Sequence, residues 1–410
     1  MTPFQMIVSA LVVLALVIIL YFWKSKHPPL GGPPNPPNPP GPPPGGVIRE
    51  LYVADAGDAA IWTFAIADDT SRLQVPPDRY IKGDLPYDPG MTQLSSPMDV
   101  AVDTVSLFVL NQYTDGDGNL LPGNGVDPNG NPLPNVNPIL IFNTNRSGDF
   151  KPYSWWGPDA FPHATDGTPQ AVPLCMAISS KNPDSLLLGE QGTAGTFVQQ
   201  MDKFPQAPGN HGQPVTSNLN SGYVTGIATH KEDDGTVSFA LVWTNPPQVP
   251  PSQNPPPQYA VLFFANTPNF AVVPAMATQT ITGPNKSLNR PQRIAFGPDG
   301  SLFVTNWGDQ QGHGSVTIYD RDANGNYQFG RPIGGLWQPT GIALGIDGTI
   351  YVADLARILV FDPRDVAAAK SDVIEPKQVV EVNTMFAAPD GTNQMPLSAE
   401  LNGMAIRTVL

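Results

Sequence analysis

The 410-residue chain has a single cysteine, Cys175, so an internal disulfide is excluded and cysteine usage does not indicate a redox compartment. Its five histidines are scattered and no Cys-x-x-Cys pair occurs, which argues against a structural zinc site. Basic residues are also scarce, with 21 Lys and Arg against 35 Asp and Glu. The net charge of −14 argues against nucleic acid as a partner, because phosphates need a basic surface.

Charged residues are absent from the apolar run Phe4–Trp23, which at about twenty residues is long enough to cross a bilayer as a helix. Aromatic residues at its end, followed by Lys24 and Lys26, are typical of a membrane interface. A cleaved signal peptide is the alternative, but the basic leading segment and the small-x-small cleavage site that it needs are both missing. We predict a single-pass anchor at residues 1–27 that contacts the lipid bilayer.

The side of the membrane on which the remaining chain lies stays open. Lys24 and Lys26 favour the cytoplasmic side under the positive-inside rule, whereas the glycosylation sequons at Asn145 and Asn285 favour the exterior. Residues 28–46 are a Pro/Gly-rich linker, which we expect to form polyproline II and to act as a spacer. Its PxxP spacing also fits a ligand for a proline-binding groove, but no Arg or Lys flanks it.

Short apolar runs recur at regular spacing over residues 47–410. The clearest unit is Pro339–Pro363, in which GIAL, TIYVAD and RILVF indicate three strands, A, B and C, and Asp347-Gly348 indicates a tight turn. The segment Pro291–Asp320 repeats this frame with IAF, LFV and VTIYD. A less regular strand D precedes each next unit. Such self-similarity predicts a repeat architecture.

Strand B ends in an acidic or amide residue each time that it occurs. The six residues are Asp55, Asn111, Glu190, Asn245, Asn306 and Asp354. One interpretation is that these six side chains form a ring of binding residues on one face of the fold. Regular recurrence favours the structural alternative, in which each side chain accepts a hydrogen bond from the backbone of the following turn.

The first strand B, Leu51–Asp55, has no strand A before it, and the missing strand matches Asn402–Val409 at the other end of the chain. Pairing of these two segments would close a ring and remove the exposed sheet edges. We therefore predict an all-β fold for residues 47–410, a six-bladed β-propeller.

The unit Pro-x-Gly-Ile-Ala…Asp-Gly…Ile-Tyr-Val-Ala-Asp…Arg-Ile…Val-Phe-Asp resembles the NHL repeat of six-bladed propellers, which are related in fold to gluconolactonase-like propellers. The resemblance is close in the last two complete units, looser in the middle ones, and poorly specific for activity. In calcium-dependent lactonases of this kind, metal ligands lie just before strand A. The residues that correspond to them here are Asn402, Met98, Leu174, Thr225, Gln292 and Thr340. Because they include no carboxylate, the resemblance does not extend to a lactonase-type centre.

Two loops contain the residue types of a calcium site. Asp320, Asp322, Asn324 and Asn326, with a glycine at the sixth position, match the first half of an EF-hand loop, but position twelve is Arg331 and not glutamate. A second, partial match is formed by Asp115, Asp117 and Asn119. The alternative for both is a turn rich in Asp, Asn and Gly.

The longest connections all lie in B–C and D–A loops, which leave a propeller on the same face, whereas the A–B connections are tight turns. We expect recognition on this loop face, with Trp156, Trp307, Asp115, Asp117 and Asn119 as candidate contacts and Trp155 and Trp337 as either contacts or seam-filling core. The sequence thus favours a membrane-tethered binding or scaffold module whose partner is a protein or a larger assembly. The alternative is a propeller hydrolase or lyase with a channel-mouth site, although the Gly-x-Ser-x-Gly motif of serine hydrolases is absent.

Overall fold

The computed structural model describes residues 48–409 except for 83–93, 95, 113–138, 146–150, 157–170, 180–184, 193–197, 203–212, 215–221, 246–257, 266–275, 284–287, 309–312 and 383–399. The predicted anchor and linker, as well as Asp115, Asp117 and Asn119, lie outside this range. Within it, no helix is long and apolar enough to span a bilayer. The short helix α2, Pro363–Ala368, begins after the N-cap Asp362, whose side chain accepts a hydrogen bond from the backbone of Arg364.

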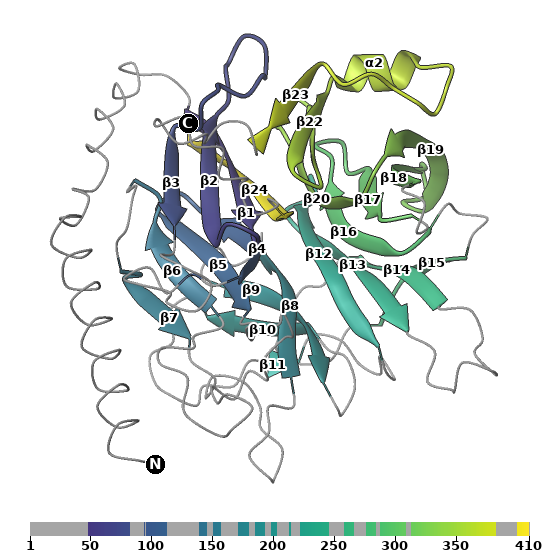
Figure 1. The fold of residues 1–410 in the computed structure, drawn as a ribbon. Helices are drawn as coiled ribbons and strands as arrows, with labels where there is room; N and C mark the ends of the chain where they lie inside the picture. Colours follow the sequence, from purple (N-terminus) through teal and green to yellow (C-terminus); the bar gives the residue numbers. More distant parts are fainter. Residues whose placement is uncertain are drawn as a thin grey trace, which may run out of the picture. The chain divides into compact units, whose positions relative to one another are not determined.

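The described strands form six four-stranded antiparallel sheets, which we number I to VI (Figure 1). Sheet I contains β24 (Leu401–Val409), β1 (Ile48–Asp55), β2 (Ala60–Ala65) and β3 (Arg79–Lys82). Sheet II contains β4 (Ser96–Val102), β5 (Ser106–Gln112), β6 (Ile139–Asn143) and β7 (Ser154–Trp156), and sheet III contains β8 (Ala171–Ile178), β9 (Ser185–Gly192), β10 (Val198–Asp202) and β11 (Gln213–Pro214). Sheet IV contains β12 (Tyr223–Lys231), β13 (Val237–Asn245), β14 (Gln258–Phe264) and β15 (Gln279–Thr282). Sheet V contains β16 (Pro291–Phe296), β17 (Leu302–Asn306), β18 (Gly314–Arg321) and β19 (Tyr327–Leu336), and sheet VI contains β20 (Pro339–Leu344), β21 (Ile350–Asp354), β22 (Arg357–Phe361) and β23 (Gln378–Glu381).

Local chemistry explains why the chain turns between these strands. At the Asp347-Gly348 turn, Gly348 has φ +81°, a backbone conformation that a side chain would disfavour. The carboxylate of Asp347 accepts a hydrogen bond from the backbone of Thr349 at 3.1 Å, which stabilises the turn. Strands β17 and β21 are buried along their whole length, because each lies inside its sheet and between neighbouring sheets.

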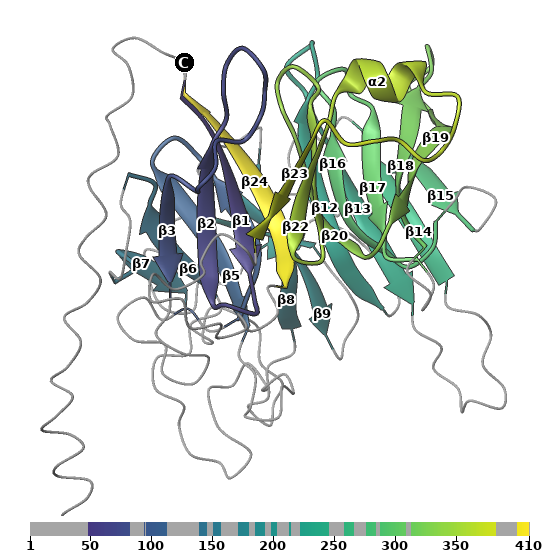
Figure 2. The same cartoon turned by 45° about the horizontal axis from the view of Figure 1, so that its top comes forward.

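The predicted pairing of the two ends of the domain is confirmed. Strand β24 runs antiparallel to β1, with Val53 opposite Met404 and Tyr52 opposite Ala405. Figure 2 shows β24, in yellow, beside β1, in purple. The first strands of the sheets contact one another in the cyclic order β24, β4, β8, β12, β16, β20 and back to β24. The fold is therefore an all-β propeller whose sheet I is built from both ends of the domain.

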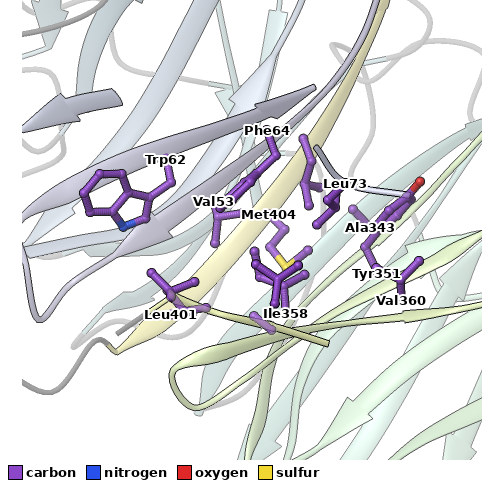
Figure 3. Packing of buried hydrophobic residues seen from close by; sticks show 14 of the residues in the cluster. Val53, Trp62, Phe64, Leu73, Ala343, Tyr351, Ile358, Val360, Leu401 and Met404 are labelled. Atoms are coloured by element: carbon purple, nitrogen blue, oxygen red, sulfur yellow. The ribbon is translucent and has the colours of Figure 1, made fainter. Parts of the chain in front are cut away.

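The seam between sheets I and VI carries one of the largest apolar clusters of the domain. Val53, Trp62 and Phe64 of sheet I belong to one cluster with Ile358 and other side chains of sheet VI, and Figure 3 shows Met404 of β24 beside Ile358. At the same seam, a Cβ atom on Gly341 of β20 would overlap the carbonyl oxygen of Asn402 in β24. Glycine is thus required there for the close approach of the two inner strands.

Candidate functional site

A cavity of about 250 Å³ is lined by the first strands of all six sheets. Three consecutive residues from each first strand line it, namely 100–102, 176–178, 227–229, 294–296, 342–344 and 404–406. The middle residue is alanine in all six strands, and its neighbours are apolar except for Thr229. In every strand the first of the three is buried and the last is partly exposed. The cavity is therefore more accessible at the ends of these strands that lead into the A–B turns.

The six alanines let the inner strands lie close together. Ala101 of β4 packs in one cluster with Met176 of the next inner strand, β8, and Ala343 of β20 packs with Met404 of β24. A larger side chain at these positions would separate neighbouring strands. The repeated apolar–Ala–apolar pattern is a sequence signal for the channel that our sequence analysis missed.

Each inner strand carries a register irregularity at the opposite, loop-face end of the channel. The shifts lie between Pro97 and Asp99, between Pro173 and Cys175, between Val224 and Gly226, between Pro291 and Ile294, between Pro339 and Gly341, and opposite Val53–Asp55 in β24. The residues inside these bulges include Met98, Leu174, Thr225, Gln292, Thr340 and Asn402, the channel-mouth positions inferred from the sequence. A bulge leaves its extra residue out of the ladder, so backbone carbonyls there become available as acceptors.

Arg293 fills this mouth of the channel. The bulge in β16 places two residues, Gln292 and Arg293, opposite Thr305, whose hydroxyl accepts the Arg293 backbone N–H at 2.9 Å. The guanidinium Nη2 donates to the carbonyl oxygens of Met98 at 2.9 Å and Leu174 at 3.5 Å. Its Nη1 donates to the carbonyl oxygen of Thr225. One side chain thereby links β16 to β4, β8 and β12.

Asp99 supplies the negative charge for Arg293. Its Oδ1 lies 3.8 Å from Nε of Arg293, and the Asp99 and Arg293 side chains are only 7% and 13% exposed. The Asp99 carboxylate also accepts the backbone N–H of Val100 and, from the next sheet, that of Met176, each at 3.0 Å. Burial raises the pKa of Asp99, and the Arg293 guanidinium acts in the opposite direction. The pair is a buried ion pair that spans the channel mouth.

This mouth does not fit the metal ion that the lactonase resemblance implies. The carbonyl oxygens that a hard cation would need already accept from a guanidinium, whose positive charge would repel a divalent cation. Two side chains of the ring, Met98 and Leu174, are apolar. None of the six positions carries a carboxylate, but Asp99 lies one residue after Met98 in β4, which the sequence pattern did not indicate.

The residues that end strand B have a structural role where their side chains are described. Asp55, Asn111, Asn306 and Asp354 are buried, whereas the side chains of Glu190 and Asn245 lie outside the described residues. The side-chain oxygens accept backbone N–H groups of the segment that enters the first strand of the same sheet: Glu400 to Asp55, Ser96 to Asn111, Asn289 to Asn306, and both Trp337 and Gln338 to Asp354.

The sequence predicted that the donors to these side chains lie in the turn after strand B. This prediction is wrong, because the donors lie mainly in the segment before strand A. Asp55 also accepts from Asp58 in the following turn, at 3.3 Å. The correction has a physical reason, because antiparallel pairing puts the end of strand B level with the start of strand A, as in the pair Pro97 and Asn111. For Asp55 the donor is Glu400, so this hydrogen bond also links the two ends of the domain.

The half EF-hand segment is the hairpin turn between β18 and β19. Asp320 lies in β18 opposite Gln328, away from the turn itself. The carboxylate of Asp322 accepts the backbone N–H groups of Asn324 at 2.8 Å and Asn326 at 2.9 Å. These hydrogen bonds hold the pKa of Asp322 below its usual value. The geometry matches the turn alternative, and among the described residues no group of three or more His, Cys, Asp and Glu could hold a metal ion.

Two tryptophans lie on the loop face. Trp307 follows β17, is half-buried, and has the guanidinium of Arg290 4.2 Å from its ring centroid. Its indole N–H has no acceptor among the described residues. Trp337 precedes β20 and is 58% exposed, so the seam-filling interpretation is wrong for this residue. Trp156 lies in β7, but its side chain and that of Trp155 are outside the described residues.

No protein-family model matches the chain, and no curated protein matches its sequence. Among solved structures, a functionally unknown protein from Desulfotomaculum acetoxidans is similar at 15% identity and a TM-score of 0.41, over 80% of this chain and 79% of that chain. A protein of unknown function from Bacteroides caccae is similar at 8% identity and a TM-score of 0.42, over 88% and 99%. A gluconolactonase from Xanthomonas campestris is similar at 17% identity and a TM-score of 0.30, over 46% and 57%.

Proposed function

We propose that this protein is a membrane-tethered binding or scaffold module that recognises another protein, or an assembly, through its loop face. In this proposal the six sheets are the blades of a six-bladed, NHL-like propeller, residues 4–23 are a single-pass anchor, and residues 28–46 are a spacer. The observation that carries the proposal is the filled channel mouth. Because Arg293 occupies the loop-face end of the channel in the described part of the chain, a small substrate could not enter the channel from that face.

The strand ends support the choice of this face. The segments 113–138, 157–170, 246–257 and 383–399 lie outside the described residues, but the strands that border them end on the face where strand B ends and strand A begins. The exposed Trp337 is on the same face, and tryptophan is enriched among the residues that dominate binding energies at protein interfaces. A hydrolase or lyase with its site at this mouth is disfavoured, since the buried Arg293–Asp99 pair takes up the space that a substrate would need.

Two substitutions in sheet VI test the proposed face. Trp337 and Ile346 lie at opposite ends of the sheet and are 58% and 65% exposed. We expect Trp337→Ala to weaken binding of the partner about 30-fold or more, the effect of a hot-spot residue, and Ile346→Ala to leave it unchanged. The partner is captured by crosslinking to the full-length chain and its affinity is measured for both variants. Equal affinities, or a loss with Ile346→Ala alone, would place recognition elsewhere.

The tether is tested by alkaline carbonate extraction of membranes from cells that express the full-length chain. We expect the chain in the membrane pellet, and a variant without residues 4–23 in the extract, because a helix of about twenty apolar residues inserts stably. Release of the full-length chain by carbonate would contradict the anchor.

A further inference from the structure

The bulged mouth of the channel is a cage of oxygen atoms around a positive charge. Carbonyl oxygens of Met98, Leu174 and Thr225 and the carboxylate of Asp99 come from three inner strands, and all four residues contact the guanidinium of Arg293. Main-chain carbonyls together with a carboxylate are the ligand types that calcium takes in proteins. The cage therefore has the chemistry of a hard-cation site, although a side chain of the protein fills it.

The cage requires a cation for an electrostatic reason. Asp99 is 5% exposed, and a carboxylate buried to this degree without a partner is strongly destabilised. The bulge carbonyls add dipoles whose negative ends point at the same place. The glycines around the mouth confirm how little space is left, since a Cβ atom on Gly226 would lie 2.8 Å from Cα of Arg293, and one on Gly403 would overlap Asp99.

We propose that Arg293 is a built-in cation that replaces a metal ion at the channel mouth, and that the cage binds a divalent cation, with Asp99 as a ligand, once the guanidinium is removed. In the unsubstituted chain the mouth is closed to metal ions. The inference is independent of the proposed partner, because it concerns only the inner strands.

The test uses the full-length chain with Arg293→Ala, and in parallel Arg293→Met, which preserves more of the side-chain volume. After purification in chelator, calcium binding is measured by equilibrium dialysis and unfolding by heating at increasing calcium. We expect both variants to unfold at lower temperature than the parent without calcium. We expect them to gain one bound calcium, with a dissociation constant of about 10⁻⁴–10⁻³ M, and to recover part of the lost unfolding temperature.

Asp99→Asn in the same background identifies the site. Calcium that binds elsewhere on the protein binds equally to Arg293→Ala and to the double variant. The difference in bound calcium between the two variants therefore measures binding in the cage. Arg290→Ala is the matched control, because it removes a guanidinium from the same segment without touching the mouth. If a variant unfolds in chelator, recovery by calcium that depends on Asp99 is the expected result. The absence of an Asp99-dependent calcium effect in both variants, or its presence in the parent chain, would overturn the proposal.

Discussion

Removal of residues 402–410 is expected to abolish the cooperative unfolding transition of the propeller and to cause aggregation. The truncation deletes nearly all of β24, so β1 becomes an exposed edge strand and the apolar seam with sheet VI loses Met404, one buried side chain worth about 1.5–3 kcal/mol. It also removes Arg407, which is paired with the buried Glu50 at 3.1 Å. Glu50 keeps its ion pair with Arg79 and the hydrogen bond from Tyr52, so the opening of the ring is the main effect of the truncation.

The measurement is thermal unfolding followed by circular dichroism, together with size-exclusion chromatography of the full-length and truncated chains. A chain that lacks residue 410 alone is the control. A second control joins the strands covalently: because Ile48 lies opposite Val409, a short hairpin linker can connect β24 to β1 in a permuted chain that starts within 383–399. We expect this permuted chain to unfold cooperatively. An unchanged transition in the truncated chain would show that β24 does not close the propeller.

The second large effect is expected for Asp99→Ala, with a loss of about 3–5 kcal/mol in the free energy of unfolding. The substitution leaves the buried Arg293 without its carboxylate and leaves the backbone N–H of Met176 without its acceptor. Denaturant unfolding of the full-length chain measures the change. Asp233→Ala, an exposed residue of an A–B turn, is the control and is expected to change stability by less than about 0.5 kcal/mol.

A double-mutant cycle separates the ion pair from other effects of the substitution. If Asp99 and Arg293 stabilise the fold through each other, Asp99→Ala combined with Arg293→Met will cost less than the sum of the single changes, because the double variant leaves no unpaired buried charge. Additive losses would show that the two residues act separately. The cycle is measured in chelator, so that metal binding by the Arg293 variant does not contribute.

The propeller fold and the pairing of β24 with β1 could be predicted from the sequence because they follow from local patterns. Asp-Gly turns set the strand lengths in units such as Pro339–Pro363, and the single strand B without its own strand A required a partner from the other end. These signals recur in unit after unit. The looser match of the middle units therefore did not change the predicted fold.

The ion pair at the channel mouth could not be predicted from local patterns, because it depends on long-range geometry. The residues before each apolar–Ala–apolar triplet are Asp99, Cys175, Gly226, Arg293, Gly341 and Gly403. This position holds opposite charges in two strands that lie three apart in the cyclic order, and small residues in the other four. The contact becomes visible only when the inner strands are aligned and the bulges turn Arg293 into the mouth.

The pairing of β24 with β1 also sets the order in which the chain can finish folding during synthesis. The hydrogen bond from the backbone of Glu400 to Asp55 cannot form until Glu400, 345 residues later in the chain, has been synthesised. Until β24 leaves the ribosome, β1 keeps an open edge on which strands of neighbouring nascent chains can add. The interval between translation of these two strands is therefore the period in which β1 is open to pairing with other chains.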